Sequence, residues 1–167
     1  KNNFDISFFV PCLNEEENII ATIQTIQSAL AKFNLIYEIV VVDDNSTDNT
    51  VKIVEKYQTE NPHLNITLIK NNYTKGLGAN YIDISFKVNG KYYMLINGDH
   101  AEPENTLILI LRELGKADMI IPYYEHDNRD FIRTFLSFFF TLLVNIISGY
   151  KVPYYNGPVL HLRFNVM

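Results

Sequence analysis

Residues 38–48 have the sequence EIVVVDDNSTD, in which an uninterrupted apolar run precedes a cluster of short polar residues. Continuous Val and Ile residues are typical of a strand that is buried on both faces, as in a parallel sheet. The polar cluster favours a turn, and residues 47–57 are predicted to form a helix. The stretch therefore predicts a strand, a turn and a helix in that order.

The same order of elements recurs on both sides of this stretch. Further apolar runs predict strands over residues 6–10, 65–69, 92–96 and 119–121. Helical spacing and end signals predict helices over residues 15–30, 78–87 and 103–114. Asn14 and Glu17 have the form of a capping box at the start of the first of these helices. Alternating strands and helices predict an α/β fold with a mainly parallel sheet flanked by helices.

Size and composition limit the possible functions. The 167 residues, of which 47% are hydrophobic and 20% charged, fit one globular domain. The formal charge of -5 argues against nucleic acid as a partner, because a phosphate-binding face must be basic. A single cysteine, Cys12, excludes an internal disulfide and a multi-cysteine zinc site. No signal peptide is visible, and the chain lacks an initiator Met and a terminating signal, so we expect a longer natural protein.

Polar side chains follow three of the predicted strands where each strand ends, at residues 14–15, 43–44 and 97–99. In an open parallel sheet the ligand binds beyond the carboxyl ends of the strands, so we expect these side chains to share one crevice. Asp99 offers the hard oxygen ligand that a divalent cation bridging two phosphates prefers. The alternatives are that Asp99 is a solvated turn residue and that the next helix is capped by Asp44, Ser46 or Asp48.

Other motifs argue against several classes of enzyme. Residues 75–78, KGLG, could bring backbone and ammonium groups close to phosphate, but they lack the spacing of a P-loop. The G-x-G-x-x-G fingerprint is absent as well, which argues against a dinucleotide oxidoreductase. The four histidines show neither metal-binding spacing nor a paired nucleophile, so a hydrolase triad has no support.

Four motifs taken together resemble those of family-2 glycosyltransferases, which have the GT-A fold. They are VPCLNEEEN at residues 10–18, VDDNSTD at 42–48, GLG at 76–78 and NGD at 97–99. Their order and spacing are similar to those of the polyprenyl-phosphate mannose and glucose synthases within that family. The resemblance spans nearly the whole chain.

The resemblance implies roles for particular residues. It implies that the nucleotide sugar contacts Pro11, Leu13, Glu15, Val42, Asp43, Asp44, Asn97, Gly98 and Asp99. Asn97, Gly98 and Asp99 occupy the Asp-x-Asp positions, so Asp99 and Asn97 are the expected ligands of Mg²⁺ or Mn²⁺ on the diphosphate. Arg133 and Ser137 correspond to an Arg and a Ser that face the acceptor phosphate. Asp99 and Arg133 are the residues that we expect to be catalytic.

Three positions depart from the family pattern. Asn97 replaces the first Asp of Asp-x-Asp, Ala101 replaces a further polar metal ligand, and Tyr124 replaces an Arg. Asn97 offers only a neutral oxygen, so we expect metal binding to be weaker than in typical members.

The implied reaction is transfer of a hexose from GDP-mannose or UDP-glucose to polyprenyl phosphate, by one in-line displacement with inversion. A phosphate nucleophile is ionised at neutral pH and needs no general base. One alternative is a saccharide acceptor, for which a base could come from His100, Glu102 or Asp118. A second alternative is a domain that binds the donor without turnover, which the departures at Asn97 and Ala101 would suit.

The character of the chain changes near residue 123, so we divide it into a nucleotide-sugar-binding α/β part, residues 1–122, and an acceptor-side or membrane-interface segment, residues 123–167. An apolar, Phe-rich helix is predicted over residues 131–147, with a polar stripe formed by Arg133, Ser137, Thr141 and Asn145. A membrane-spanning helix needs about 20 apolar residues, so we expect an amphipathic helix in the membrane interface. The alternatives are a core helix and a contact in a homodimer. The expected location is peripheral, at the cytoplasmic face of a membrane, or the cytoplasm.

Overall fold

A six-stranded sheet organises the larger part of the computed structural model, which describes residues 4–122, 131–149, 151 and 158–163. The strands in chain order are β1 (Phe4–Cys12), β2 (Tyr37–Asp43), β3 (Ile66–Lys70), β4 (Gly90–Leu95), β5 (Met119–Ile120) and β6 (Leu160–Leu162). Their order across the sheet is β3-β2-β1-β4-β6-β5. β1 to β4 are parallel to one another, whereas β6 runs antiparallel to both β4 and β5.

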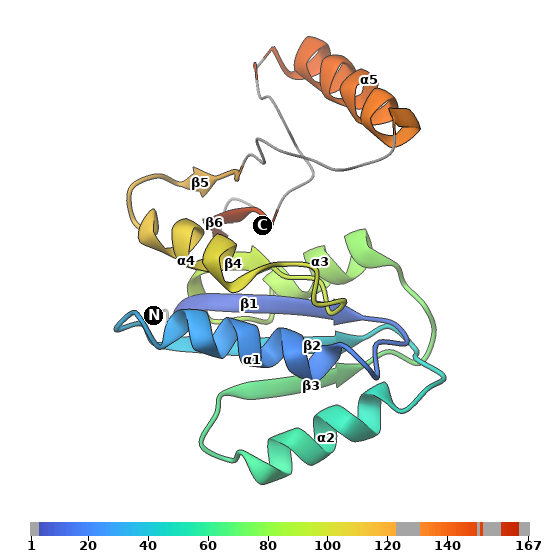
Figure 1. The fold of residues 1–167 in the computed structure, drawn as a ribbon, viewed down its shortest axis with the longest axis vertical. Helices are drawn as coiled ribbons and strands as arrows, with labels where there is room; N and C mark the ends of the chain where they lie inside the picture. Colours follow the sequence, from blue (N-terminus) through green and yellow to red (C-terminus); the bar gives the residue numbers. More distant parts are fainter. Residues whose placement is uncertain (1–3, 123–130, 150, 152–157, 164–167) are drawn as a thin grey trace. The chain divides into compact units, whose positions relative to one another are not determined.

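Helices cover both faces of this sheet (Figure 1). One face packs against α1 (Ile19–Leu30), α2 (Thr50–Glu60) and α4 (Glu104–Arg112), and the other packs against α3 (Leu77–Ser85). Successive strand residues therefore enter different cores: Phe8 lies in the first cluster and Phe9 in the second. This two-sided burial explains why the central strands are continuously apolar. The predicted α/β fold is confirmed.

Two details differ from the sequence predictions. The sequence patterns did not predict β6. This strand lies in the predicted second segment, residues 123–167, but it pairs antiparallel with β4 and so makes the sheet mixed. The capping box is wrong: α1 begins at Ile19, and its N-cap residue Asn18 makes no side-chain capping hydrogen bond. The side chain of Asn14 instead accepts hydrogen bonds from Thr47 in the loop after β2.

Residues Ile121–Val159 form a separate compact unit, whose described part contains α5 (Phe131–Ser148). The predicted apolar helix is therefore present, and side chains between Phe135 and Ile147 include many large exposed apolar groups. Within the part of the chain that the structure describes, every helix is too short or too polar to cross a membrane. Tyr124 and the side chain of Arg133 lie outside the described residues.

Candidate functional site

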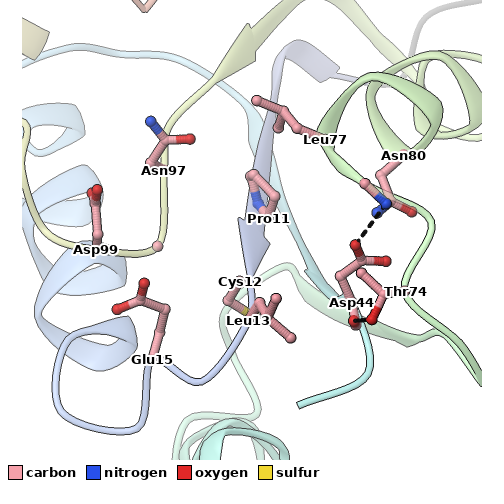
Figure 2. A pocket seen from close by; sticks show the side chains of 12 residues that line it. Pro11, Cys12, Leu13, Glu15, Asp44, Thr74, Leu77, Asn80, Asn97 and Asp99 are labelled. Atoms are coloured by element: carbon pink, nitrogen blue, oxygen red, sulfur yellow. Dashed lines mark hydrogen bonds between the residues drawn. The ribbon is translucent and has the colours of Figure 1, made fainter.

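A pocket of about 310 Å³ opens beyond the carboxyl ends of β1, β2 and β4. Residues that the sequence predicted for the site and that line this pocket are Pro11, Leu13, Glu15, Asp44, Asn97, Gly98 and Asp99. Figure 2 shows two walls on either side of Pro11. One wall carries Glu15, Asn97 and Asp99, and the opposite wall carries Asp44, Thr74 and Asn80. The expected crevice is thus formed by loops from different strands.

The other predicted site residues do not line the pocket. Val42 is fully buried in the core beneath α3. Asp43 is also buried, and its Oδ2 accepts a hydrogen bond of 3.1 Å from the backbone N–H of Ser46. Arg133 and Ser137 lie on α5, in the other compact unit. The pocket belongs entirely to the unit that contains the sheet.

A web of hydrogen bonds fastens the β1–α1 loop to the β2–α2 loop. Asn14 donates its backbone N–H to Ser46 and accepts the N–H of Thr47. Two residues further on, the backbone N–H of Glu16 donates to Asp48, and the Glu16 carboxylate accepts from Asn49. Asn14 has a φ of 58°, a left-handed conformation that Asn tolerates better than most residues. The polar residues of the motifs at residues 10–18 and 42–48 therefore fix the shape of the two loops that border the pocket.

Asp44 anchors the loop between β3 and α3. Its Oδ1 accepts hydrogen bonds from the side chain of Asn71 at 2.8 Å and from the backbone N–H of Lys75 at 2.9 Å. Its Oδ2 accepts the N–H of Gly76 at 2.8 Å, and its backbone carbonyl accepts the hydroxyl of Thr74. Asp44 therefore does not cap α2, which was one alternative. Burial favours the neutral acid, but these donors outweigh it and lower the pKa of Asp44 to about 2.

Replacement Asp44→Asn is expected to lower the free energy of unfolding by about 1–2 kcal/mol at pH 7, since each unit of pKa shift corresponds to roughly 1.4 kcal/mol and water in the pocket screens part of the effect. The depressed pKa means that ionised Asp44 stabilises the fold above its unfolded pKa, near 4. This contribution is lost as the pH falls through the folded pKa of about 2. Urea unfolding between pH 7 and pH 2 should show the wild type approaching the variant. A constant difference would contradict this account.

Asp99 is exposed on the β4–α4 loop, at the mouth of the pocket. Its Oδ1 accepts the backbone N–H of Ala101 at 3.1 Å. The residue before it, Gly98, lies against β1: a Cβ atom there would come 2.9 Å from the carbonyl oxygen of Pro11. Real side chains do not approach a backbone oxygen so closely, so this loop position requires glycine. Asp99 thus follows a turn that is pressed against the end of β1.

Residues 7–166 match the family described as Glycosyl transferase family 2. The chain belongs to this family. A dolichyl-phosphate beta-glucosyltransferase from Dictyostelium discoideum is 26% identical over 165 residues, which cover 87% of this chain and 50% of that protein. A dolichol-phosphate mannosyltransferase from Pyrococcus furiosus is 29% identical over 115 residues, which cover 69% of this chain and 31% of that protein. The chain spans between 31% and 59% of the length of the curated relatives that it matches.

A solved structure supports the family fold as well. Glucosyl-3-phosphoglycerate synthase from Mycobacterium tuberculosis, in complex with Mn²⁺, uridine diphosphate and phosphoglyceric acid, is 18% identical to this chain. The alignment covers 97% of this chain and 57% of that one, with a TM-score of 0.72. At this identity the likeness shows the fold alone. The resemblance that the motifs indicated and the GT-A fold are both confirmed.

The oxygen atoms at the pocket suit a divalent metal ion only if a substrate supplies further ligands. The carboxylates that line the pocket are Glu15, Asp44 and Asp99, and Asp44 is already occupied by the β3–α3 loop. Among the residues described here, no group of three or more His, Cys, Asp or Glu side chains could hold a metal ion. Mg²⁺ is commonly bound by one or two carboxylates together with substrate phosphates and water. Asp99, aided by Glu15 or Asn97, fits that type of site.

The three candidate general bases do not lie together. His100 and Glu102 follow Asp99 on the same loop, and the His100 Nε2 lies 3.0 Å from the hydroxyl of Thr25. Asp118 precedes β5, which runs in the same direction as β4, because both are antiparallel to β6. The backbone N–H of Leu162, which pairs with Tyr92 of β4, donates to the carbonyl oxygen of Asp118, and Asp118 does not line the pocket.

Sequence reasoning missed part of the pocket wall. The additional lining residues are Cys12, Thr74 and Asn80, whereas Gly76 and Leu77, which also line it, belong to the KGLG stretch that the sequence had singled out. Asn80 is only 2% exposed and shares the buried face of α3 with Ile84, one turn further along. In the sequence, Asn80 stands four residues before an apolar residue of the predicted helix, a spacing that places both on the buried face. A buried amide needs hydrogen-bonding partners, so this polar residue could have been recognised as part of a site.

Proposed function

We propose that this chain is the donor-binding part of an enzyme that transfers a hexose from GDP-mannose or UDP-glucose to polyprenyl phosphate, with inversion. The observation that carries the proposal is the pocket itself. It combines the apolar surface of Pro11, Leu13 and Leu77 with the exposed carboxylate of Asp99, at the carboxyl edge of a family-2 glycosyltransferase sheet. An apolar wall suits a nucleoside, and a carboxylate beside it suits a metal-bound diphosphate.

Each wall of the pocket has a proposed task. Asp99, with Glu15 or Asn97, would hold Mg²⁺ or Mn²⁺, and the ion would supply positive charge that stabilises the departing nucleoside diphosphate. The opposite wall is kept in shape by Asp44, whose bonds to Lys75 and Gly76 hold the start of α3 in place. Asp43 and Val42 would support the pocket from the protein interior, because both side chains are buried.

The acceptor is proposed from the relatives and from chemistry. The two curated relatives described above are named for transfer to dolichyl or dolichol phosphate. A phosphate nucleophile is already ionised and needs no base. We further propose that the segment that contains α5 forms the acceptor side, with Arg133 and Ser137 toward the acceptor phosphate. In this proposal α5 rests on the cytoplasmic face of a membrane, because its apolar side chains suit the interface.

Isothermal titration of GDP-mannose, UDP-glucose, GDP and UDP tests the donor site. The nucleotides of one base are expected to bind with micromolar to millimolar affinity in Mn²⁺, and at least about tenfold more weakly in EDTA, because Asp99 would hold the metal that supplies positive charge to the diphosphate. Incubation of the preferred donor with polyprenyl phosphate should then release the nucleoside diphosphate. Transfer to saccharides but not to polyprenyl phosphate would favour the saccharide acceptor. Binding without any product would favour a non-catalytic donor-binding domain, and absence of binding would reject the proposal.

A further inference from the structure

The hydroxyl of Thr22 connects α1 to the loop that carries Asp99. Thr22 is 2% exposed and lies in the first turn of α1. Its Oγ1 donates a hydrogen bond to the carbonyl oxygen of Gly98 at 3.1 Å and accepts one from the backbone N–H of His100 at 3.0 Å. Gly98 and His100 are the two neighbours of Asp99 in the chain. One buried hydroxyl therefore holds the backbone on both sides of the proposed metal ligand.

The conformation of this loop explains why such a contact is needed. His100 has a φ of 56°, a left-handed conformation that costs free energy for a residue other than glycine and persists where neighbouring groups hold it. On the other side, the N–H of Gly98 donates to the carbonyl oxygen of Pro11 at 3.0 Å. The loop is thus attached to β1 before Asp99 and to α1 around it. The Thr25 hydroxyl adds a contact to the ring of His100 at 3.0 Å.

We infer that Thr22 is a positioning residue, which sets the direction of the Asp99 carboxylate without touching the ligand. This inference rests on the proposed function, because it assumes that Asp99 binds the metal–diphosphate group. If the hydroxyl is removed, the Gly98 carbonyl and the His100 N–H lose their buried partner, and the loop must shift to satisfy them. A shift of the loop moves Asp99 but leaves the apolar wall that would hold the nucleoside unchanged.

The test compares Thr22→Val, which keeps the shape of the side chain, with Thr22→Ser, which keeps the hydroxyl. The binding of GDP and UDP is titrated in Mn²⁺ and in EDTA, using the nucleotide that the wild type binds. Thr22→Val is expected to weaken binding in Mn²⁺ by about 10- to 100-fold, the usual effect of removing a group that orients a metal ligand. Binding in EDTA should change by less than about threefold. Thr22→Ser should bind the nucleotide in Mn²⁺ as tightly as the wild type does, so that the Mn²⁺ effect, meaning the ratio of affinity in Mn²⁺ to affinity in EDTA, is unchanged. Thr22→Ala removes the same hydroxyl and replaces the Val variant if that one does not fold.

Ser7→Ala is the matched control. Ser7 is also fully buried, and its hydroxyl joins two elements: it donates to Glu38 at 2.5 Å and accepts the N–H of Gly90 at 2.8 Å. Its removal should lower the unfolding temperature without changing the Mn²⁺ effect. If Thr22→Val binds like the wild type, or if Ser7→Ala loses the Mn²⁺ effect equally, the positioning role is overturned. If the wild type binds neither nucleotide, the proposed function itself fails, which the titration of the wild type alone reveals.

Discussion

Asp99→Ala is expected to lower kcat/KM for hexose transfer by about 10²–10³-fold, the range found when one group that stabilises developing charge is removed. The carboxylate is exposed at the pocket mouth. Among the residues that the structure describes, the other carboxylates lining the pocket are Glu15 and Asp44, and Asp44 is already hydrogen-bonded to the β3–α3 loop. Asn97 supplies a neutral oxygen, which cannot replace the lost charge. The measurement is nucleoside diphosphate release at several Mn²⁺ concentrations, with the unfolding temperature recorded in parallel.

Stability should hardly change in this variant, because an exposed substitution usually alters the free energy of unfolding by no more than about 0.5 kcal/mol. Asp118→Ala serves as the control, since it removes an exposed carboxylate that does not line the pocket. Asp99→Asn should fall between wild type and Asp99→Ala, and higher Mn²⁺ should recover part of its activity. Equal rates for Asp99→Ala and Asp118→Ala would show that Asp99 does not hold the metal.

Gly90→Ala is expected to destabilise the fold by about 3 kcal/mol, at the upper end of the cost of overpacking a core. A Cβ atom at Gly90 would lie 2.4 Å from the Ser7 Oγ, 2.5 Å from the Ser7 backbone nitrogen and 2.8 Å from the Ile6 carbonyl carbon. Two of these atoms belong to the backbone of β1, so they cannot move without disturbing the pairing of β1 with β4. Urea unfolding monitored by circular dichroism measures the loss.

Gly78→Ala is the matched control for Gly90→Ala. Gly78 lies within α3, and apart from its chain neighbours and the backbone of its own helix no atom lies within 4 Å of a Cβ placed there. Alanine is the better helix former, so this variant should be more stable than the wild type by roughly 0.5–1 kcal/mol. If both alanine variants have the same midpoint of unfolding, the close approach of β4 to Ser7 is not important for stability.

The order of strands and helices was predictable because the central strands are buried on both faces. Residues 39–42 illustrate the reason: Ile39 and Val41 enter one core, and Val40 and Val42 enter the other. No polar residue could be tolerated in either set, which produced the continuous apolar run of the sequence. The location of the site followed from the same logic, since polar residues can begin only where the strands leave both cores.

The roles of adjacent polar residues were harder to predict. Asp43 and Asp44 look equivalent in the sequence, yet Asp43 points into a buried turn and Asp44 lines the pocket. Side chains alternate along a strand, and Val42 lies beneath α3, so the next two residues diverge. Sequence alone does not say which face carries the pocket. In the same way, Asn14 had the spacing of a helix cap, but the neighbouring loop offered its side chain better donors.

The position of β6 determines when this sheet can be completed during synthesis. β5 pairs only with β6 among the described strands, and β6 also covers the edge of β4. α4, β5 and α5 all leave the ribosome before residues 160–162 do. Until then the edge of β4 is unpaired, and an unpaired edge is a template for association with another chain. The growing chain therefore passes through a stage in which β1 to β4 can fold while their sheet stays open to intermolecular pairing, and emergence of β6 ends that stage.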